Sequence, residues 1–220
     1  NGFSDRGWSS WNDQFRNALK GWHPYDNIGY IFGNWHHDFD SEKIRRVFAG
    51  SPREMGGQYV DIAHSVNYLE SHDDHTLGDF IRIATGKVGK NEIITDFSKH
   101  ATLTEKEISI HKIAAISLLT SQGTVMIAQG QEWGRSKVIA DTDVPDNNVG
   151  ILDHNSYEKD NETNWLNWDH KDVNFELVNF YRYLITLRKE FSVFRRASYR
   201  DITFLDCSIE KAIAYHIHMP

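Results

Sequence analysis

The chain has 220 residues, of which 40% are hydrophobic and 25% are charged, a composition typical of a globular protein that can bury one substantial core. The formal net charge of −7 argues against broad nucleic-acid binding, which depends on neutralising phosphates with Lys and Arg. No run of 18 apolar residues is present, so we expect no membrane span. The single cysteine, Cys207, allows neither an internal disulfide nor a cysteine-based zinc site.

The start of the chain and its histidines bear on processing and on cofactors. The sequence begins at Asn1 rather than Met and shows no signal peptide, so we expect a fragment or processed product, and the compartment of the parent protein stays open. The 12 histidines are scattered rather than clustered, so we expect no dedicated metal site and no cofactor. The sequence leaves calcium binding open.

The first half of the chain mixes helical and extended patterns. Asn12 can cap a short helix, behind which apolar side chains recur at helical spacing. A second amphipathic helix is predicted over residues 41–48 and ends near Gly50. Strand character returns over residues 65–70, an apolar run that stops at a group of acids and imidazoles, and a helix-compatible segment follows.

The second half repeats the alternation. Thr104 and the acids after it predict a capped helix, and residues 124–128 form an apolar run of strand length. Residues 141–164 are polar and turn-rich, the pattern of a long irregular loop, which inside a compact domain is usually functional or disordered. The clearest helix covers residues 175–191, where apolar side chains form one stripe.

The end of the chain changes character. Residues 201–206 and 212–218 read as two strands separated by a polar turn, which suggests that a new domain begins near residue 196. The alternation before it favours parallel strands joined by right-handed crossovers. A complete eight-stranded α/β barrel needs roughly 250 residues, so the units predicted here amount to less than half of one.

Residues 71–75 (Ser-His-Asp-Asp-His) carry the most chemistry, because two imidazoles flank two carboxylates directly after a predicted buried strand. An α/β barrel carries its functional groups at this carboxyl end of the strands. A loop of solvated charges is the simpler interpretation. The context of neighbouring segments decides between the two.

That context is a resemblance to a known family. Residues 67–73 (Asn-Tyr-Leu-Glu-Ser-His-Asp) resemble the fourth signature region of the α-amylase superfamily, in the version of type I pullulanases and related debranching enzymes. Other segments resemble the same family in collinear order, so that the resemblance covers almost the whole chain: residues 11–21, 123–133, 155–157 with 164–168, and 180–194. Asp74 and Asn161 depart from the pattern, since debranching relatives more often carry Asn and Asp there.

The resemblance implies a fold and a set of site residues. The fold would be the C-terminal half of a (β/α)₈ TIM barrel, about strand six to helix eight, over residues 1–195, followed by the start of a C-terminal β-sandwich domain over residues 196–220. Asp73 would be the third carboxylate of the family's site, which stabilises the distorted, oxocarbenium-like ring. The residues implied to contact substrate are His72, Tyr157 and Asn164, with Trp133 or Trp165 stacking on sugar.

The implied activity belongs to the intact parent protein. It would hydrolyse α-glucan polysaccharides or oligosaccharides with retention, at α-1,6 bonds of pullulan, starch or glycogen, the alternative being an α-1,4-acting amylase-type member. Retention needs a nucleophile and a general acid roughly 5 Å apart. The family motifs for both are missing, because residues 2–5 lack the required arginine and Glu70 reads as a supporting acid on the alternate strand face. We expect the isolated chain to be inactive.

Two other classes stay in view. A metal-dependent phosphohydrolase would carry a His-Asp dipeptide on a helix among further ligands, whereas residues 66–71 read as a strand. A non-catalytic carbohydrate-binding relative would keep the barrel and lose the carboxylates, and the presence of Asp73 argues modestly against it.

Overall fold

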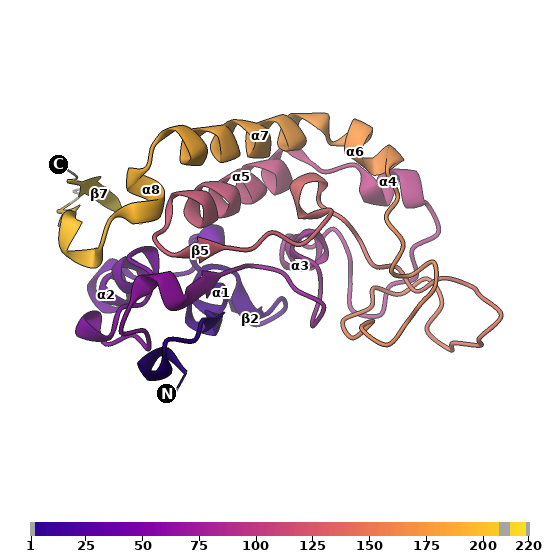
Figure 1. Ribbon diagram of the computed structural model, residues 1–220. Coiled ribbons are helices and arrows are strands. Elements are labelled where there is room, and N and C mark those ends of the chain that lie inside the picture. Colours follow the sequence, from indigo (N-terminus) through magenta and orange to yellow (C-terminus); the bar gives the residue numbers. More distant parts are fainter. Residues whose placement is uncertain (1–2, 207–211, 219–220) are drawn as a thin grey trace.

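The computed structural model describes residues 3–206 and 212–218 (Figure 1). A parallel three-stranded sheet lies at its centre, with the strand order β1 (Ser10–Trp11), β4 (Ser65–Asn67), β5 (Thr124–Val125). Helices separate the successive strands of this sheet along the chain, so the fold is of the α/β class and the predicted alternation is confirmed. The helices are α1 (Asp13–Leu19), α2 (His37–Phe48), α3 (Leu77–Ala84), α4 (Phe97–Ala101), α5 (Glu105–Thr120), α6 (Asp169–Val173), α7 (Phe175–Glu190) and α8 (Val193–Arg196).

Smaller elements complete the chain. Antiparallel pairs of strands form between β2 (Gly21–His23) and β3 (Asn27–Ile28), and between β6 (Ile202–Leu205) and β7 (Ala214–Ile217). In the described residues, no helix has the length and apolar character needed to cross a membrane. In the part of the chain that the structure describes, six 3₁₀ turns link these elements: η1 (Ser4–Arg6), η2 (Tyr30–Phe32), η3 (Arg53–Met55), η4 (Ile62–His64), η5 (Gln131–Trp133) and η6 (Tyr199–Asp201).

The central strands are shorter than the apolar runs predicted them to be. Pairing in β4 stops at Asn67, although Tyr68 and Leu69 continue the run and are buried. The neighbouring strand sets this limit, because the chain leaves β1 at Asn12, whose side chain accepts a hydrogen bond from the Phe15 N–H and caps α1. The predicted cap at Asn12 is confirmed, and it ends the pairing of β1 with β4.

A buried polar cluster ties the three strands together at this point. The amide nitrogen of Asn12 lies 3.0 Å from Ser51 Oγ and Ser65 Oγ and 2.8 Å from Asn67 Oδ1, and these three acceptors share its two N–H donors. The amide of Asn67 in turn donates to Ser121 Oγ and to the Gln122 carbonyl. Buried polar groups are stabilising only when satisfied, so this mutual arrangement fixes the register of β1, β4 and β5.

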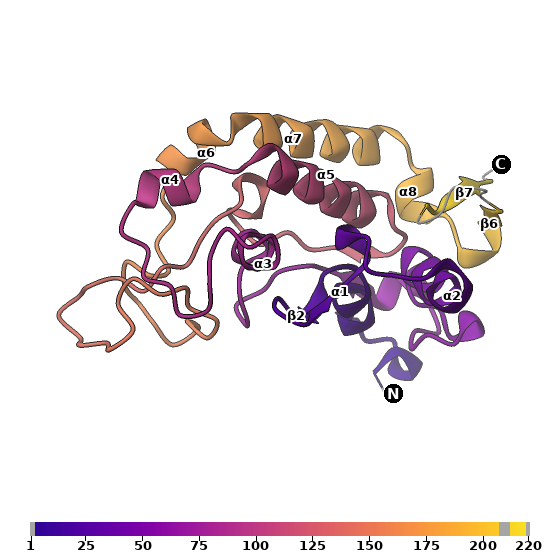
Figure 2. The ribbon, with the colours of Figure 1, turned by 180° about the vertical axis from the view of Figure 1, so that it is seen from behind.

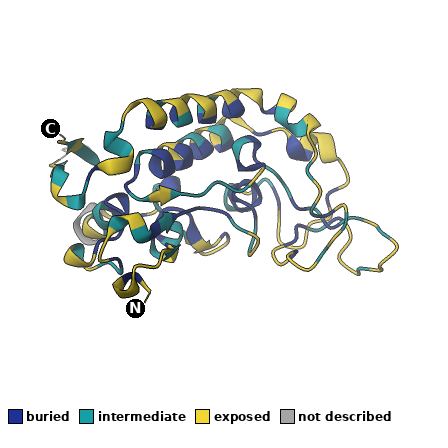
Figure 3. Cartoon of the chain, viewed as in Figure 1, coloured by how far each residue is buried: buried dark blue, intermediate teal, exposed yellow. Residues whose placement is uncertain are grey.

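Helices α5 and α7 run side by side over one face of the sheet (Figures 1 and 2). A Thr104–Glu107 capping box begins α5, as predicted from the sequence. Because α5 lies between the sheet and α7, apolar residues on two sides of it are buried, whereas the outer side of α7 is exposed (Figure 3). The core between α5 and α7 consists of Ala115, Leu119, Leu177, Tyr181 and Leu184.

The C-terminal hairpin predicted from residues 201–206 and 212–218 is confirmed as β6 and β7. Its Tyr215 ring lies 5.8 Å from that of Phe48 in α2, and the Tyr215 hydroxyl donates to Thr120 Oγ1 at 2.8 Å. The hairpin therefore packs against the α/β part of the chain. The predicted turn between its strands, and Cys207 within it, lie outside the described residues.

Candidate active site

The His72–Asp73 pair lies on the loop of residues 71–76, which precedes α3 in the segment between β4 and α3. His72 Nδ1 and Asp73 Oδ1 are 2.9 Å apart, and both side chains are 57% exposed, so both are accessible to a ligand. The His72 ring also contacts Trp11, which ends β1, with a centroid distance of 5.6 Å. The carboxyl ends of parallel strands meet at one edge of a sheet, and these residues gather there.

Tyr157 joins the group from the long loop after β5. Its ring lies edge-on to His72 at 6.3 Å and is 55% exposed. Three of the predicted site residues, Asp73, His72 and Tyr157, are therefore brought together by the fold. Asp73 and Tyr157 are 84 positions apart in the sequence, so only the fold brings them together.

The carboxylate of Glu70 stabilises the ends of the loop of residues 71–76. It is 2% exposed, and its Oε2 accepts a hydrogen bond from the Leu77 N–H, the first residue of α3, at 2.9 Å. Burial raises the pKa of Glu70 to about 7. Because this bond joins the segment that follows β4 to the start of α3, it closes the loop that carries Asp73. Glu70 has the supporting position that the sequence indicated.

Lys137 holds the middle of the same loop from the segment after β5. Its Nζ donates to the Asp74 carbonyl at 2.9 Å, and its own backbone N–H donates to Asp79 Oδ2 at 2.8 Å. Asp74 has a φ of 67°, a left-handed conformation that is uncommon for a residue other than glycine. The ammonium group of Lys137 stabilises this turn, and burial lowers the pKa of Lys137.

Thr76 completes the support. Its hydroxyl accepts from the Asp79 N–H at 2.9 Å, which caps α3, and donates to the Arg135 carbonyl at 2.7 Å. The spacing Thr-x-x-Asp was a readable capping signal that the sequence analysis did not use. Lys137 had no such signal, because its partner at position 74 is distant in sequence. A further buried cation, Lys20, lies beneath the loop, and burial lowers its pKa to about 8.

Asn164 has a structural position within the long loop. Its Oδ1 accepts from Ser156 Oγ at 2.7 Å, while its Nδ2 donates to the carbonyls of Ser156 and Lys159 at 2.5 and 2.6 Å. The side-chain groups that the sequence assigned to substrate are thus engaged with the neighbours of Tyr157. Asn164 organises the segment that presents Tyr157.

The two tryptophans predicted as stacking partners differ in exposure. Trp133 is 2% exposed and packs against Trp168 at 5.2 Å, whereas Trp165 is 62% exposed. A ring that is almost fully buried offers no face to a sugar. The burial of Trp133 therefore corrects that half of the prediction, and Trp165 keeps the role as a proposal.

The arrangement also bears on the metal-dependent alternative. His72 and Asp73 lie on a loop rather than on a helix. Within residues 3–206 and 212–218, no group of three or more His, Cys, Asp or Glu side chains is arranged to hold a metal ion. This geometry does not fit the helical ligand set of a His-Asp phosphohydrolase.

Sequence comparison finds relatives, although no protein-family model matches the chain. It is 30% identical to a pullulanase of Bacillus subtilis strain 168 over 214 residues, which is 94% of this chain and 26% of that protein. A glycogen debranching enzyme of Erwinia tasmaniensis is 29% identical over 198 residues, 82% of this chain and 26% of that protein. Isoamylase 1 of Arabidopsis thaliana is 28% identical over 200 residues, 83% of this chain and 22% of that protein.

Solved structures agree. The apo pullulanase of Paenibacillus barengoltzii superposes with a TM-score of 0.72 at 27% identity, over 94% of this chain and 28% of that one. The type I pullulanase of Bacillus subtilis in complex with maltose gives 0.69 at 27% identity, over 96% of this chain and 26% of that one. The chain thus spans about a quarter of the length of the relatives it matches.

Relatives by sequence and by structure define one class, the starch- and glycogen-processing glycoside hydrolases. Within that class the chain belongs to the α-amylase superfamily, in the group of the pullulanases, glycogen debranching enzymes and isoamylases. The resemblance read from residues 67–73 and the collinear segments is confirmed.

Proposed function

We propose that the protein to which this chain belongs hydrolyses α-1,6 bonds of branched α-glucans with retention, and that Asp73 stabilises the transition state. The observation that carries the proposal is the accessible His72–Asp73 pair at the carboxyl ends of parallel strands, in a chain 30% identical to a pullulanase over 94% of its length. The names of the relatives, pullulanase and glycogen debranching enzyme, favour branched glucans over linear ones.

Each residue has a role in this proposal. Asp73 accepts hydrogen bonds from hydroxyls of the sugar at the cleavage point, and these bonds strengthen as the ring approaches an oxocarbenium ion. His72, fixed by its contact with Trp11, donates to the same sugar. Tyr157 and Trp165 offer exposed rings to neighbouring sugars, and Asn164 keeps Tyr157 in position.

We further propose that β1, β4 and β5 are strands six to eight of a (β/α)₈ barrel over residues 1–195, and that residues 196–220 begin a C-terminal β-sandwich domain. Two observations support this. The three strands are parallel and adjacent in chain order, and in the described part of the chain β1 and β5 each pair on one side only. Barrel closure would supply the strands that pair with both edges.

The proposal assigns the nucleophile and the general acid to residues outside these 220. A retaining site needs two carboxyl groups roughly 5 Å apart on either side of the scissile bond. Glu70 is buried and bonded to Leu77 N–H, so it takes neither role. The isolated chain is accordingly proposed to be inactive.

Reducing-sugar release by the intact parent from pullulan, glycogen and amylose tests this function. We expect cleavage of pullulan and glycogen, slow or no cleavage of amylose, and an α-anomeric first product in NMR spectra. The isolated 220-residue chain, assayed in parallel, should release nothing. Preference for amylose would favour the α-1,4 alternative, and failure to cleave any of the three glucans would overturn the hydrolase proposal.

A further inference from the structure

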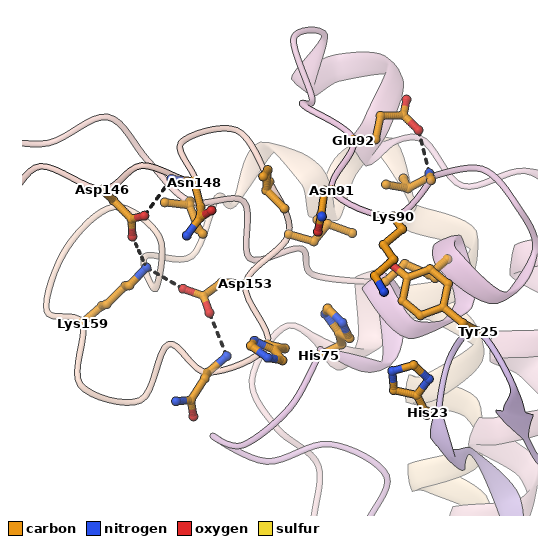
Figure 4. A pocket seen from close by; sticks show the side chains of 18 residues that line it. His23, Tyr25, His75, Lys90, Asn91, Glu92, Asp146, Asn148, Asp153 and Lys159 are labelled. Atoms are coloured by element: carbon orange, nitrogen blue, oxygen red, sulfur yellow. Dashed lines mark hydrogen bonds and ion pairs between the residues drawn. The ribbon is translucent and has the colours of Figure 1, made fainter.

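A pocket of about 380 Å³ opens among three loops next to the His72–Asp73 loop (Figure 4). Its walls come from the β2–β3 hairpin, from the segment after α3, and from the long loop after β5. His75, two residues beyond Asp73, lies between these walls, whereas neither His72 nor Asp73 lines the pocket. Its volume falls within the usual range for small-molecule sites.

Rings and apolar side chains form much of the lining. Tyr25, on the β2–β3 hairpin, is 44% exposed, and its ring is 5.3 Å from that of His23. The rings of His75 and His154 approach each other at 5.8 Å with an angle of 36°. Ile139 and Leu152 are buried and add an apolar surface. Flat rings and apolar patches match the C–H faces of sugar rings.

The carboxylates of the pocket already have partners. Lys159 Nζ lies 2.8 Å from Asp146 Oδ2 and 2.7 Å from Asp153 Oδ2. Glu92 Oε2 accepts from the Gly89 N–H at 2.6 Å. Since the acidic groups are engaged and both signs of charge are present, the lining does not select a strongly charged ligand.

Uncommitted polar groups are available to hydroxyls. The Nδ1 atom of His75 is buried and has no hydrogen-bond partner among the described residues. Burial also lowers the pKa of His75, so near neutral pH its ring carries one donor and one acceptor nitrogen. His154 and Lys90 are exposed and add further polar atoms around the opening.

We propose that this pocket binds a neutral, hydroxyl-rich oligosaccharide, a short segment of α-glucan, with Tyr25 stacking on one ring and His75 and His154 bonding its hydroxyls. The proposal rests on the proposed function, because that function makes α-glucan the ligand at hand. The pocket holds one arm of the glucan while another part of the same substrate reaches Asp73. It therefore adds affinity for long or branched substrates.

Hydrogen exchange of the intact parent tests this binding. The parent carries Asp73→Asn so that sugar is not consumed, and maltotetraose is the probe. We expect maltotetraose to protect residues 85–92 and 146–155 from exchange. Tyr25→Ala and His154→Ala should each raise the maltotetraose concentration needed for half-maximal protection about tenfold, the scale of one lost contact. Both side chains are exposed, so their removal should leave the fold intact.

Matched controls come from the same chain. Tyr183→Ala removes a tyrosine that is 63% exposed on α7, and His216→Ala removes an exposed histidine that contacts His218 on β7. Neither should change the protection. Absence of protection at saturating maltotetraose would overturn the pocket. So would protection in Tyr25→Ala and in His154→Ala as strong as in the parent that keeps both side chains. Hydrolysis of pullulan by the unmodified parent is scored separately, so loss of the pocket and loss of the proposed function are distinct results.

Discussion

Two loops at the carboxyl ends of the strands are held in opposite ways. The short loop of residues 71–76 is held by buried groups, Glu70 at 2% and Lys137 at 3% exposure. The long loop of residues 141–164 is held by polar contacts nearer the surface, around Asn164 and Lys159. Removing one partner of a buried charged contact destabilises a protein strongly, whereas an exposed ion pair contributes little. Geometry in the short loop should therefore be the more rigid and the more sensitive to mutation.

Lys137→Met should produce the largest effect in this comparison. The substitution keeps the length of the side chain but removes the donor to the Asp74 carbonyl and a cation close to Glu70. We expect kcat of the intact parent on pullulan to fall about 10- to 100-fold, because small displacements of a reacting group are costly. The free energy of unfolding should fall by about 3 kcal/mol.

Steady-state kinetics and urea unfolding measure both quantities. Lys106→Met, which removes an exposed lysine from α5, is the matched control and should change neither. An unchanged kcat in a destabilised Lys137→Met protein would show that the short loop keeps Asp73 in position without this clamp.

Glu70→Gln should change how stability depends on pH. The native pKa of Glu70, about 7, lies above its ordinary value of 4.5, so the native protein binds the extra proton between these two values. The contribution of Glu70 to stability should therefore be lost as pH rises through this window, by about 3 kcal/mol in all. Glu70→Gln should lack this decline and gain stability relative to the wild type as pH rises.

Urea unfolding at a series of pH values below 8 measures the difference. The limit matters because burial lowers the pKa of Lys20 to about 8, which makes stability rise with pH above that value. Parallel pH profiles for the wild type and Glu70→Gln would contradict a buried, proton-binding Glu70.

Asn164→Ala should have an intermediate effect, on binding more than on turnover. It removes the hydrogen bonds to Ser156 and Lys159, so the unfolding free energy should fall by about 1–2 kcal/mol. Because Tyr157 is released rather than deleted, KM for pullulan should rise several-fold with little change in kcat. Asn179→Ala, on the exposed side of α7, is the control. An equal loss in kcat would place Asn164 closer to the chemistry than its contacts indicate.

Lys159→Met should have the smallest effect. Its two ion pairs, with Asp146 and Asp153, involve an ammonium side chain that is 26% exposed. We expect a loss of about 1 kcal/mol or less in unfolding free energy, and a smaller loss at high salt, where such pairs are screened. A large, salt-independent loss would mean that the long loop is held as firmly as the short one.

Local signals in the sequence predicted much of this fold. The caps at Asn12 and Thr104 and the stripe of α7 depend on neighbours within one or two helical turns, and the structure has all three. The His72–Asp73 loop was also predicted, because an apolar run stopped abruptly at charged residues. In each case the determining residues lie close together in the sequence.

Long-range contacts account for what the sequence missed. The bond from Asn12 to Asn67 joins residues 55 positions apart, and the bond from Lys137 to Asp74 joins residues 63 positions apart. The sequence around one partner carries no signal for the other. The same reason explains Trp133 and Trp165. Trp133 ends η5, which packs against α3, α6 and α7, and this tertiary packing separates the buried ring of Trp133 from the exposed ring of Trp165.

Adjacent carboxylates on the short loop provide the most direct test of the central claim, that Asp73 stabilises the transition state. The kcat of the intact parent on pullulan should fall at least about 100-fold for Asp73→Asn, with little change in melting temperature. Asp74→Asn should stay within about threefold of the wild type, because Asp74 contributes its backbone carbonyl and Asn tolerates a φ of 67°. Unchanged turnover in Asp73→Asn, or equal losses in both variants, would contradict the account.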